Sequence, residues 1–461
     1  MSPLRKYDFT IFSDSDSFVP QSRGINENER VVWSPFKDSG VKETFRSRLN
    51  RLFTKRALLL VCLLILLPAW PSVGGVHKKP TPAEVEAVHE KALTIDTHCD
   101  TPMNMVEKGT DIGKRNATGK VDLPRMKAGG LDAMFFAVFT GQKKRTAENY
   151  GEAYSLANEM ITATLSAVNK CNDLAEMAYN ADDAARIEKK GKRAIYLGME
   201  NGFPIAKDLS RVEEFYKKGI RYMTLCHSFN NDICDSSTDG KGAEHNGLSP
   251  FGREVVKEMN RLGMIIDVSH ISDKSFYDVL NVSSAPVIAS HSSVRAIAHH
   301  KRNLSDDMIK ALAAKGGVIQ ICLLDEYVKD PDSTNIGYKK IAELRKIYYG
   351  KWDSLTEAEK AEFRRQRDEL EARYPASLPG VKDYVDHIDH VVKLVGIDYV
   401  GIGSDFDGGG GLSDCPDVSK FPNITRELMI RGYSDTDIYK IWGGNFLRVF
   451  RKVEKVADAG K

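Results

Sequence analysis

Short apolar runs alternate with stretches of helical periodicity along most of the chain, and eight of these runs are typical of buried parallel strands. They are Ala92–Asp96, Ala133–Phe139, Ala194–Leu197, Tyr222–Leu225, Met264–Val268, Pro286–Ala289, Val318–Cys322 and Tyr399–Ile402. The stretches between them, such as 147–168 and 252–262, are amphipathic and long enough for crossover helices. The pattern predicts an α/β fold, a (β/α)8 barrel of the TIM type, with its reactive groups at the carboxyl ends of the strands.

The N-terminal part of the chain lies outside this pattern. Residues 1–45 are polar and without periodicity, which predicts a disordered extension. Residues 46–75 combine basic residues, an apolar run and small residues, as in a signal peptide or a signal-anchor. We therefore expect an exported protein of the periplasm or cell envelope. If the segment is a signal-anchor, it would hold the protein in the cytoplasmic membrane. The catalytic barrel is expected over residues 84–455. It contains a charged helical insertion at about 325–381, which we interpret as a solvated helical hairpin; the alternative is a lid or a dimer contact.

Composition narrows the classes of partner. The 461 residues carry a formal net charge of +2, which is too small for strong electrostatic attraction to nucleic acid. No nucleic-acid partner is therefore expected. The seven cysteines contain no C-x-x-C pair, which argues against a cysteine zinc site. We interpret them as mostly buried free thiols, with disulfides as the alternative in an oxidising compartment.

Ionisable side chains follow six of the eight predicted strands. They are His98 and Asp100 after the first strand, Glu200 after the third, His227 after the fourth, Asp267 at the end of the fifth with His270 after it, His291 after the sixth and Asp405 after the eighth. One histidine after a strand is usually an ordinary polar residue. Because the carboxyl ends of barrel strands meet at one mouth, six strands ending this way predict a reactive site there.

Imidazole and carboxylate groups in this order suggest a two-metal centre. Residues i and i+2 of a strand share a face, so His98 and Asp100 could bind one ion. His270 and His291 come from adjacent strands and could hold a second ion, with Glu200 between the two pairs as a bridging carboxylate. This ligand set suits zinc, and manganese or cobalt less selectively.

A centre of this kind is typical of a metal-dependent hydrolase. Two ions about 3.5–4 Å apart can share a bridging hydroxide nucleophile and polarise a scissile carbonyl. Asp405, at the last strand, is then free to take a proton from the attacking water and pass it to the leaving nitrogen.

These residues lie in motifs that resemble those of the membrane (renal-type) dipeptidases over about residues 84–455. The motifs are IDTHCDTP at 95–102, GMENG at 198–202, TLCHSFNN at 224–231, DVSHIS at 267–272, ASHSSVRAI at 289–297, KRNLSDD at 301–307 and SDFDG at 404–408. The resemblance implies two zinc ions on His98, Asp100, bridging Glu200, His270 and His291. It also implies substrate recognition by His227 and Arg302, proton transfer by Asp405, and a homodimer. The expected substrates are L-Xaa-L-Xaa and L-Xaa-D-Xaa dipeptides.

The chain departs from the mammalian pattern of that family in places. Phe229 and Ala298 stand where mammalian members have cysteines, and the last residues are not apolar. These departures favour a bacterial envelope enzyme over a mammalian brush-border one.

Two alternatives remain beside the dipeptidase hypothesis. Other binuclear amidohydrolases, which hydrolyse cyclic amides or β-lactams, share the barrel but usually begin with His-x-His, whereas this chain has His98-x-Asp100. A non-catalytic binding barrel would have lost its ligands piecemeal, whereas all five predicted ligands are present here.

Overall fold

A computed structural model describes residues 79–348, 355–375 and 377–460. The predicted extension at 1–45 and the predicted leader at 46–75 lie outside the described residues. Within the described ranges, no helix combines the length and the apolar character needed to cross a membrane.

Nine strands of the described chain form one parallel sheet. They are β1 Ile95–Cys99, β2 Ala133–Phe139, β3 Ala175–Met177, β4 Arg193–Glu200, β5 Ile220–Thr224, β6 Ile265–Asp267, β7 Ile288–Ser292, β8 Val318–Ile321 and β9 Val400–Ile402. Eight of them follow the order β1-β2-β4-β5-β6-β7-β8-β9, and β3 pairs with the start of β4. A parallel bridge between Cys99 and Phe406 joins the last strand region to the first. The predicted (β/α)8 barrel is therefore confirmed.

Three strands continue past the ends of their apolar runs, and one of them is β4, which was predicted to end at Leu197 but continues to Glu200. The first strand was predicted over Ala92–Asp96, but β1 covers Ile95–Cys99 and so contains His98. Similarly, β7 continues to Ser292 and contains His291. At the mouth of the barrel the backbone pairing continues although the side chains there are polar. For these three strands, a prediction from the apolar residues alone therefore ends several residues before the real strand does.

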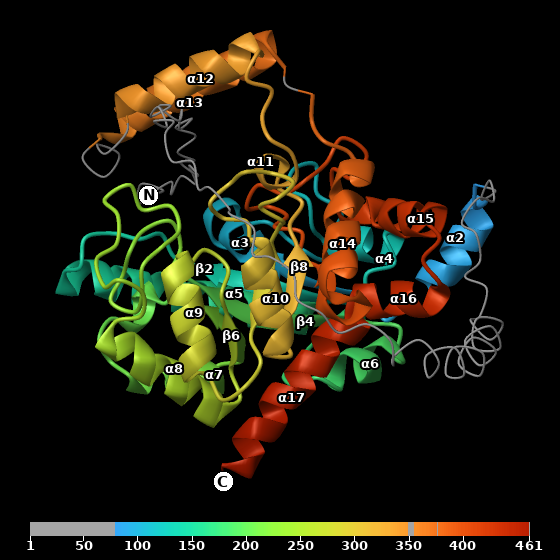
Figure 1. Cartoon of the computed structure of the whole chain (residues 1–461), viewed down its shortest axis with the longest axis horizontal. Helices are drawn as coiled ribbons and strands as arrows, with labels where there is room; N and C mark the ends of the chain where they lie inside the picture. Colours follow the sequence, from blue (N-terminus) through green and yellow to red (C-terminus); the bar gives the residue numbers. More distant parts are fainter. Residues whose placement is uncertain (1–78, 349–354, 376, 461) are drawn as a thin grey trace, which may run out of the picture. The chain divides into compact units, whose positions relative to one another are not determined.

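The helices surround the sheet (Figure 1). They are α2 Pro82–His89, α3 Thr101–Lys108, α4 Leu123–Ala128, α5 Ala147–Lys170, α6 Asp183–Glu188, α7 Ser210–Lys217, α8 Pro250–Leu262, α9 Asp273–Val282, α10 Asp306–Ala314, α11 Asp325–Val328, α12 Ile336–Tyr348, α13 Glu357–Arg373, α14 Val381–Val395, α15 Pro422–Ile430, α16 Asp435–Tyr439 and α17 Asn445–Ala459. Ser249, Ser272 and Ser305 begin α8, α9 and α10 as N-caps, each accepting a backbone N–H three residues ahead.

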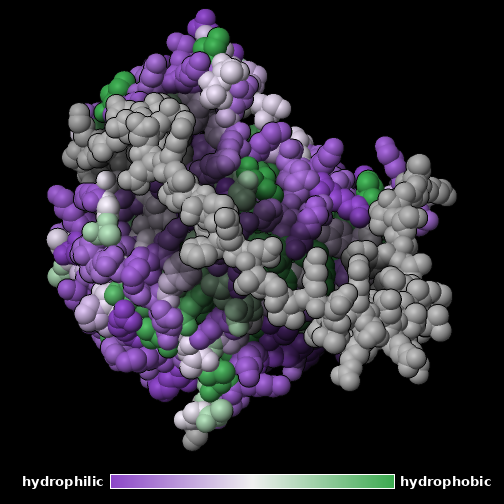
Figure 2. All heavy atoms as spheres, in the orientation of Figure 1, coloured by the Kyte–Doolittle hydropathy of each residue, from purple (hydrophilic) through white to green (hydrophobic). Residues whose placement is uncertain are grey.

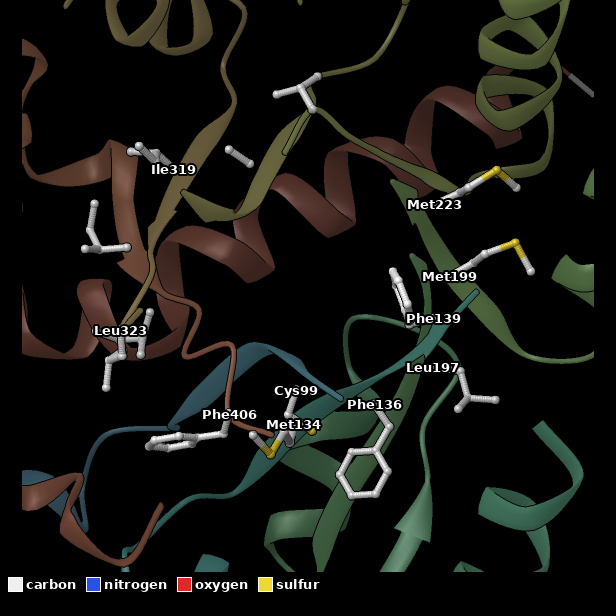
Figure 3. Close-up of a cluster of buried hydrophobic side chains, with 14 of the residues drawn as sticks. Cys99, Met134, Phe136, Phe139, Leu197, Met199, Met223, Ile319, Leu323 and Phe406 are labelled. Carbon is white, nitrogen blue, oxygen red and sulfur yellow. The ribbon is translucent and has the colours of Figure 1, made fainter. Parts of the chain in front are cut away.

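Alternate strand residues enter two different hydrophobic clusters, as the pleat of a strand requires. Met134 and Phe136 of β2 lie in the larger cluster, which also contains residues of the surrounding helices (Figure 3). Ala133 and Phe135 of the same strand lie in a second cluster that includes α17. There the ring of Phe135 packs on Phe446 of α17, with centroids 5.2 Å apart. The strands are thus anchored on both faces, which gives their carboxyl ends a rigid base.

The predicted insertion contains three helices with different environments. Helices α12 and α13 pack on each other as a hairpin that stands out from the ring of helices (Figure 1). Ile336 and Ile347 of α12 are exposed, whereas the outer surface in this view is otherwise mostly hydrophilic (Figure 2). Helix α11 differs, because Tyr327 is buried and reaches the cavity described below. The start of the predicted insertion therefore contributes to the barrel mouth.

Candidate metal centre and active site

One cavity at the carboxyl ends of the strands collects most of the residues predicted from the sequence. It is lined by Asp100, Glu200, His227, His270, Tyr327, Asp405 and Gly408. His98 and His291 lie next to Glu200 in this lining, and Arg302 packs against Tyr327. The structure thus brings all eight predicted site residues together, although they come from seven separate segments of the chain.

The carboxylate of Glu200 is the centre of the site. Its Oε2 atom lies 3.3 Å from Nε2 of His98, on β1. Its Oε1 atom lies 3.0 Å from Nε2 of His270 and 3.5 Å from Nε2 of His291. Nε2 of His227 is 3.7 Å from the same oxygen. Each oxygen of one carboxylate therefore faces a separate set of imidazoles, which is the arrangement that a bridging ligand needs.

The histidines beside Glu200 are suited to metal binding. Burial and the nearby Arg302 lower the pKa of His270 well below its usual value, and burial and His98 do the same for His291. Both rings are therefore neutral, and each has one nitrogen lone pair to donate. Their Nε2 atoms lie 2.8 Å apart on the same side of Glu200.

Unpartnered polar atoms also fit a bound cation. Nε2 of His98 and Oδ1 of Asp100 are buried and have no hydrogen-bond partner among the described residues. Burying such atoms without a partner is costly. Potential ligand atoms form three overlapping groups, and within each group the atoms lie within 4.8 Å of one another. The groups are His98, Glu200 and His291; Glu200, His227 and His270; and His98, Asp100 and Asp405.

A hydrogen-bonded chain beneath His291 sets the direction of its ring. The hydroxyl of Ser290 donates to Oδ2 of Asp267 at 2.6 Å and lies 2.8 Å from Nδ1 of His291. Since the hydroxyl proton goes to the carboxylate, the Ser290 oxygen accepts the Nδ1–H of His291. The Nε2 lone pair of His291 is then left facing Glu200. Asp267 thus supports a neighbouring residue instead of lining the cavity.

Sharp backbone turns at the strand ends aim two of the site residues. His270 and Asp405 have φ of 70° and 59°, in the left-handed region that non-glycine residues rarely adopt. At Asp405, the backbone N–H donates to the carbonyl of His98 at 3.1 Å, and its own carbonyl accepts the N–H of Gly410 at 2.7 Å. These contacts hold the strained turn in place, so that the Asp405 side chain points into the cavity.

Asp405 is in an environment that favours its protonated form. Burial and the nearby Asp100 carboxylate raise the pKa of Asp405 well above its usual range. The thiol of Cys322 donates to Oδ2 of Asp405, with a sulfur–oxygen distance of 3.8 Å. A carboxyl group with a raised pKa can hold and release a proton near neutral pH.

Arg302 places a buried positive charge beside the cavity. Its Nη2 donates to the carbonyl of His291 at 2.8 Å and its Nη1 to the Ser292 hydroxyl at 3.1 Å. The guanidinium lies 5.2 Å from the ring centre of Tyr327. Its Nε–H is buried and has no partner among the described residues, so the group retains a donor for an anionic ligand.

Tyr327 lines the cavity but was not predicted from the sequence. The residue lies in a stretch that was assigned to the charged insertion, and no spacing or motif pointed to it. Asn303, which follows Arg302 in the sequence, connects Tyr327 to the site. Its Nδ2 donates to the Tyr327 carbonyl at 3.0 Å, and its Oδ1 accepts the Ser293 N–H at 3.2 Å. The asparagine beside Arg302 in the KRNLSDD motif was the one signal that could have indicated this contact.

Comparison with known proteins agrees with this geometry. The profile described as membrane dipeptidase (peptidase family M19) matches residues 82–461. The chain belongs to the membrane dipeptidase family.

Related proteins of this metallo-dipeptidase family come from fungi and bacteria. Dipeptidase tcpJ of Claviceps purpurea is 34% identical over 75% of this chain and 72% of its own length. Dipeptidase aclJ of Aspergillus oryzae is 30% identical over 93% and 94% of the two chains. The crystal structure of the probable dipeptidase PvdM from Pseudomonas aeruginosa superposes with a TM-score of 0.74, at 33% identity over 82% of this chain and all of that chain.

Family membership makes this chain a metal-dependent dipeptidase and agrees with the groups of potential ligands around Glu200. The six cysteines within the described ranges are free, and all except Cys171 are buried. Those six residues therefore agree with the interpretation of mostly buried thiols.

Proposed function

We propose that this metallo-dipeptidase binds two zinc ions per chain and hydrolyses L-Xaa-L-Xaa and L-Xaa-D-Xaa dipeptides. The observation that supports it best is the position of Glu200, with His98 at one carboxylate oxygen and His270 and His291 at the other. Asp100, whose Oδ2 lies 3.5 Å from Nε2 of His98, would complete the first set. When bound, the zinc ions would supply a Lewis acid for the peptide carbonyl and an activated water at neutral pH.

The proposed role of Arg302 is to bind the C-terminal carboxylate of the dipeptide. The guanidinium is almost completely buried, and two of its donors are used by the barrel while Nε–H is not. A carboxylate at this position would pair with a positive charge in a medium of low dielectric constant, where the interaction is strong. Because a longer peptide has an uncharged amide at that point, this contact would restrict the enzyme to dipeptides.

The proposed role of Asp405 is proton transfer. Its side chain lies beside Asp100, and its environment favours the protonated form. Once divalent ions offset the neighbouring negative charges, the Asp405 carboxylate would accept a proton from the attacking water and deliver it to the leaving amine. His227, which also lines the cavity, would contact the substrate beside Glu200, since its Nε2 is 3.7 Å from that carboxylate.

Substrate and metal can be tested together. Purified protein should hydrolyse L,L- and L,D-dipeptides, contain about two zinc ions per chain, and lose activity to a chelator until zinc is returned. Arg302→Lys should raise KM about 10- to 100-fold and weaken the discrimination against C-terminally amidated dipeptides, because lysine cannot reproduce the planar donors of arginine.

Arg261→Lys is the matched control, since the exposed Arg261 guanidinium on α8 pairs with Glu258 and Glu213, away from the cavity. It should leave KM unchanged. Full activity of metal-free protein would refute the metal mechanism, and an unchanged preference for free carboxylates in Arg302→Lys would refute the role of Arg302.

A further inference from the structure

One buried tyrosine reaches the metal centre from the interior of the barrel. Tyr222, on β5, is completely buried, and its phenol oxygen lies 2.7 Å from Nδ1 of His98. The two residues belong to strands that are not neighbours in the sheet, because β2 and β4 separate β1 from β5. The contact therefore crosses the barrel directly beneath Glu200.

The space for this ring exists because the facing residue is glycine. Gly198 on β4 is the register partner of Tyr222. A Cβ atom at position 198 would lie 2.1 Å from Cζ of the tyrosine ring and 2.5 Å from both Cε atoms. The first glycine of the GMENG motif therefore has a specific role: its missing side chain allows the Tyr222 ring to pass across β4 to His98.

The direction of the hydrogen bond follows from the other nitrogen of His98. Nε2 faces Asp100 and Glu200 and has no hydrogen-bond partner. It can bind a cation only with its lone pair, so the single proton of the neutral ring must be on Nδ1. Nδ1 then donates, and the phenol oxygen of Tyr222 accepts.

We propose that Tyr222 is a positioning residue that fixes the tautomer and the ring orientation of His98 for metal binding, in a space that Gly198 leaves open. The proposal rests on the proposed two-metal function. It differs from the support of His291, where Ser290 and Asp267 form a hydroxyl–carboxylate chain. A neutral phenol provides the acceptor at His98, where Asp100 and Glu200 already contribute two carboxylates to the same ring nitrogen.

Tyr222→Phe tests this proposal, because phenylalanine retains the ring and removes only the acceptor. Apoprotein of the full chain is titrated with zinc against a chromophoric chelator, and the variant is compared with the wild type. The variant should bind one of the two ions about 10- to 100-fold more weakly, the usual effect of losing a support of a metal ligand. Gly198→Ala should weaken the same ion, because it displaces the ring.

Tyr196→Phe is the matched control. Tyr196 is also completely buried and packs on Phe135, as Tyr222 does, with centroid distances of 4.6 and 5.3 Å. Its hydroxyl, however, donates to the carbonyl of Asn180, away from the metal centre. Tyr196→Phe should therefore lower the melting temperature without changing the affinity for either ion.

A zinc-loaded crystal structure of the wild type gives a second reading that does not depend on the folding of any variant. It should place zinc on Nε2 of His98, with Nδ1 still within hydrogen-bond distance of Tyr222. Zinc on Nδ1, or equal zinc affinities of Tyr222→Phe and wild type, would overturn the proposal. If the wild type binds two ions but cleaves no dipeptide, the proposed substrate is wrong while the affinities still decide the role of Tyr222.

Discussion

A single added methyl group at Gly408 should disable the site without unfolding the barrel. A Cβ atom at this position would lie 2.2 Å from Oδ2 of Asp100 and 2.3 Å from Oδ1 of Asp405. Gly408 is not among the residues with positive φ, so alanine can adopt its backbone conformation. The strain of Gly408→Ala therefore falls on the two carboxylates.

The size of the effect can be worked from these distances. Non-bonded contacts are favourable at about 3.5 Å, so each carboxylate must move by about 1 Å. A misplacement of about 1 Å costs roughly 10²-fold in rate, or about 2.7 kcal/mol of transition-state stabilisation. Because Asp100 is a proposed metal ligand, reduced zinc content should accompany the loss of rate.

The assay is kcat/KM for an L,L-dipeptide, with the zinc content and the melting temperature measured on the same samples. Gly141→Ala is the matched control, since no described heavy atom lies within 4 Å of its added Cβ and its φ is not positive. It should retain the wild-type rate. A Gly408→Ala protein with wild-type kcat/KM would refute the idea that the Gly408 loop limits the positions of the two carboxylates.

Two other substitutions separate chemistry from stability. Asp405→Asn should lower kcat by about 10²- to 10⁴-fold while both zinc ions stay bound, as measured by steady-state kinetics and metal analysis; loss of an ion would make Asp405 a ligand instead. Burial lowers the pKa of His387 to about 4. Between about pH 6.5 and pH 4, His387 is therefore protonated in the unfolded chain but neutral in the folded chain, so the free energy of unfolding decreases as the pH falls through that range. Over that pH range, the free energy of unfolding measured by urea titration should decrease by up to about 3 kcal/mol less in His387→Gln than in the wild type. The same pH dependence in both proteins would contradict the lowered pKa of His387.

The residue order along the chain was sufficient to predict the barrel and the residues around Glu200. In a parallel barrel, every strand end reaches the same mouth, so ionisable residues after successive strands must converge. The same rule does not set the limits of the strands. His98 and His291 lie inside β1 and β7, because polar side chains interrupt the apolar pattern while the backbone pairing continues.

Residues that act from behind the cavity were beyond the reach of sequence patterns. Tyr222 was interpreted as one of the buried residues of a strand, and only the structure reveals its phenol oxygen beside His98. Gly408 ends the SDFDG motif, and only the structure reveals that it leaves room for two carboxylates. Each of these roles depends on contacts across the barrel, and neither periodicity nor local spacing contains that information.

The charges of the site explain why these distant supports are needed. Asp100, Glu200 and Asp405 are three buried carboxyl groups, and Arg302 is the buried cation beside them. Burial and the nearby Glu200 raise the pKa of Asp100 to about 6, which shows how unfavourable its negative charge is without a cation. Divalent ions would offset this repulsion, so metal binding should stabilise the folded chain as well as supply the chemistry. The barrel itself orders this cluster, through the strained turn at Asp405 and the hydrogen-bonded chain from Asp267 to His291. A sheet that is anchored on both faces can offset that cost, which favours the strand ends over the outlying α12–α13 hairpin as the place for such a cluster of charges.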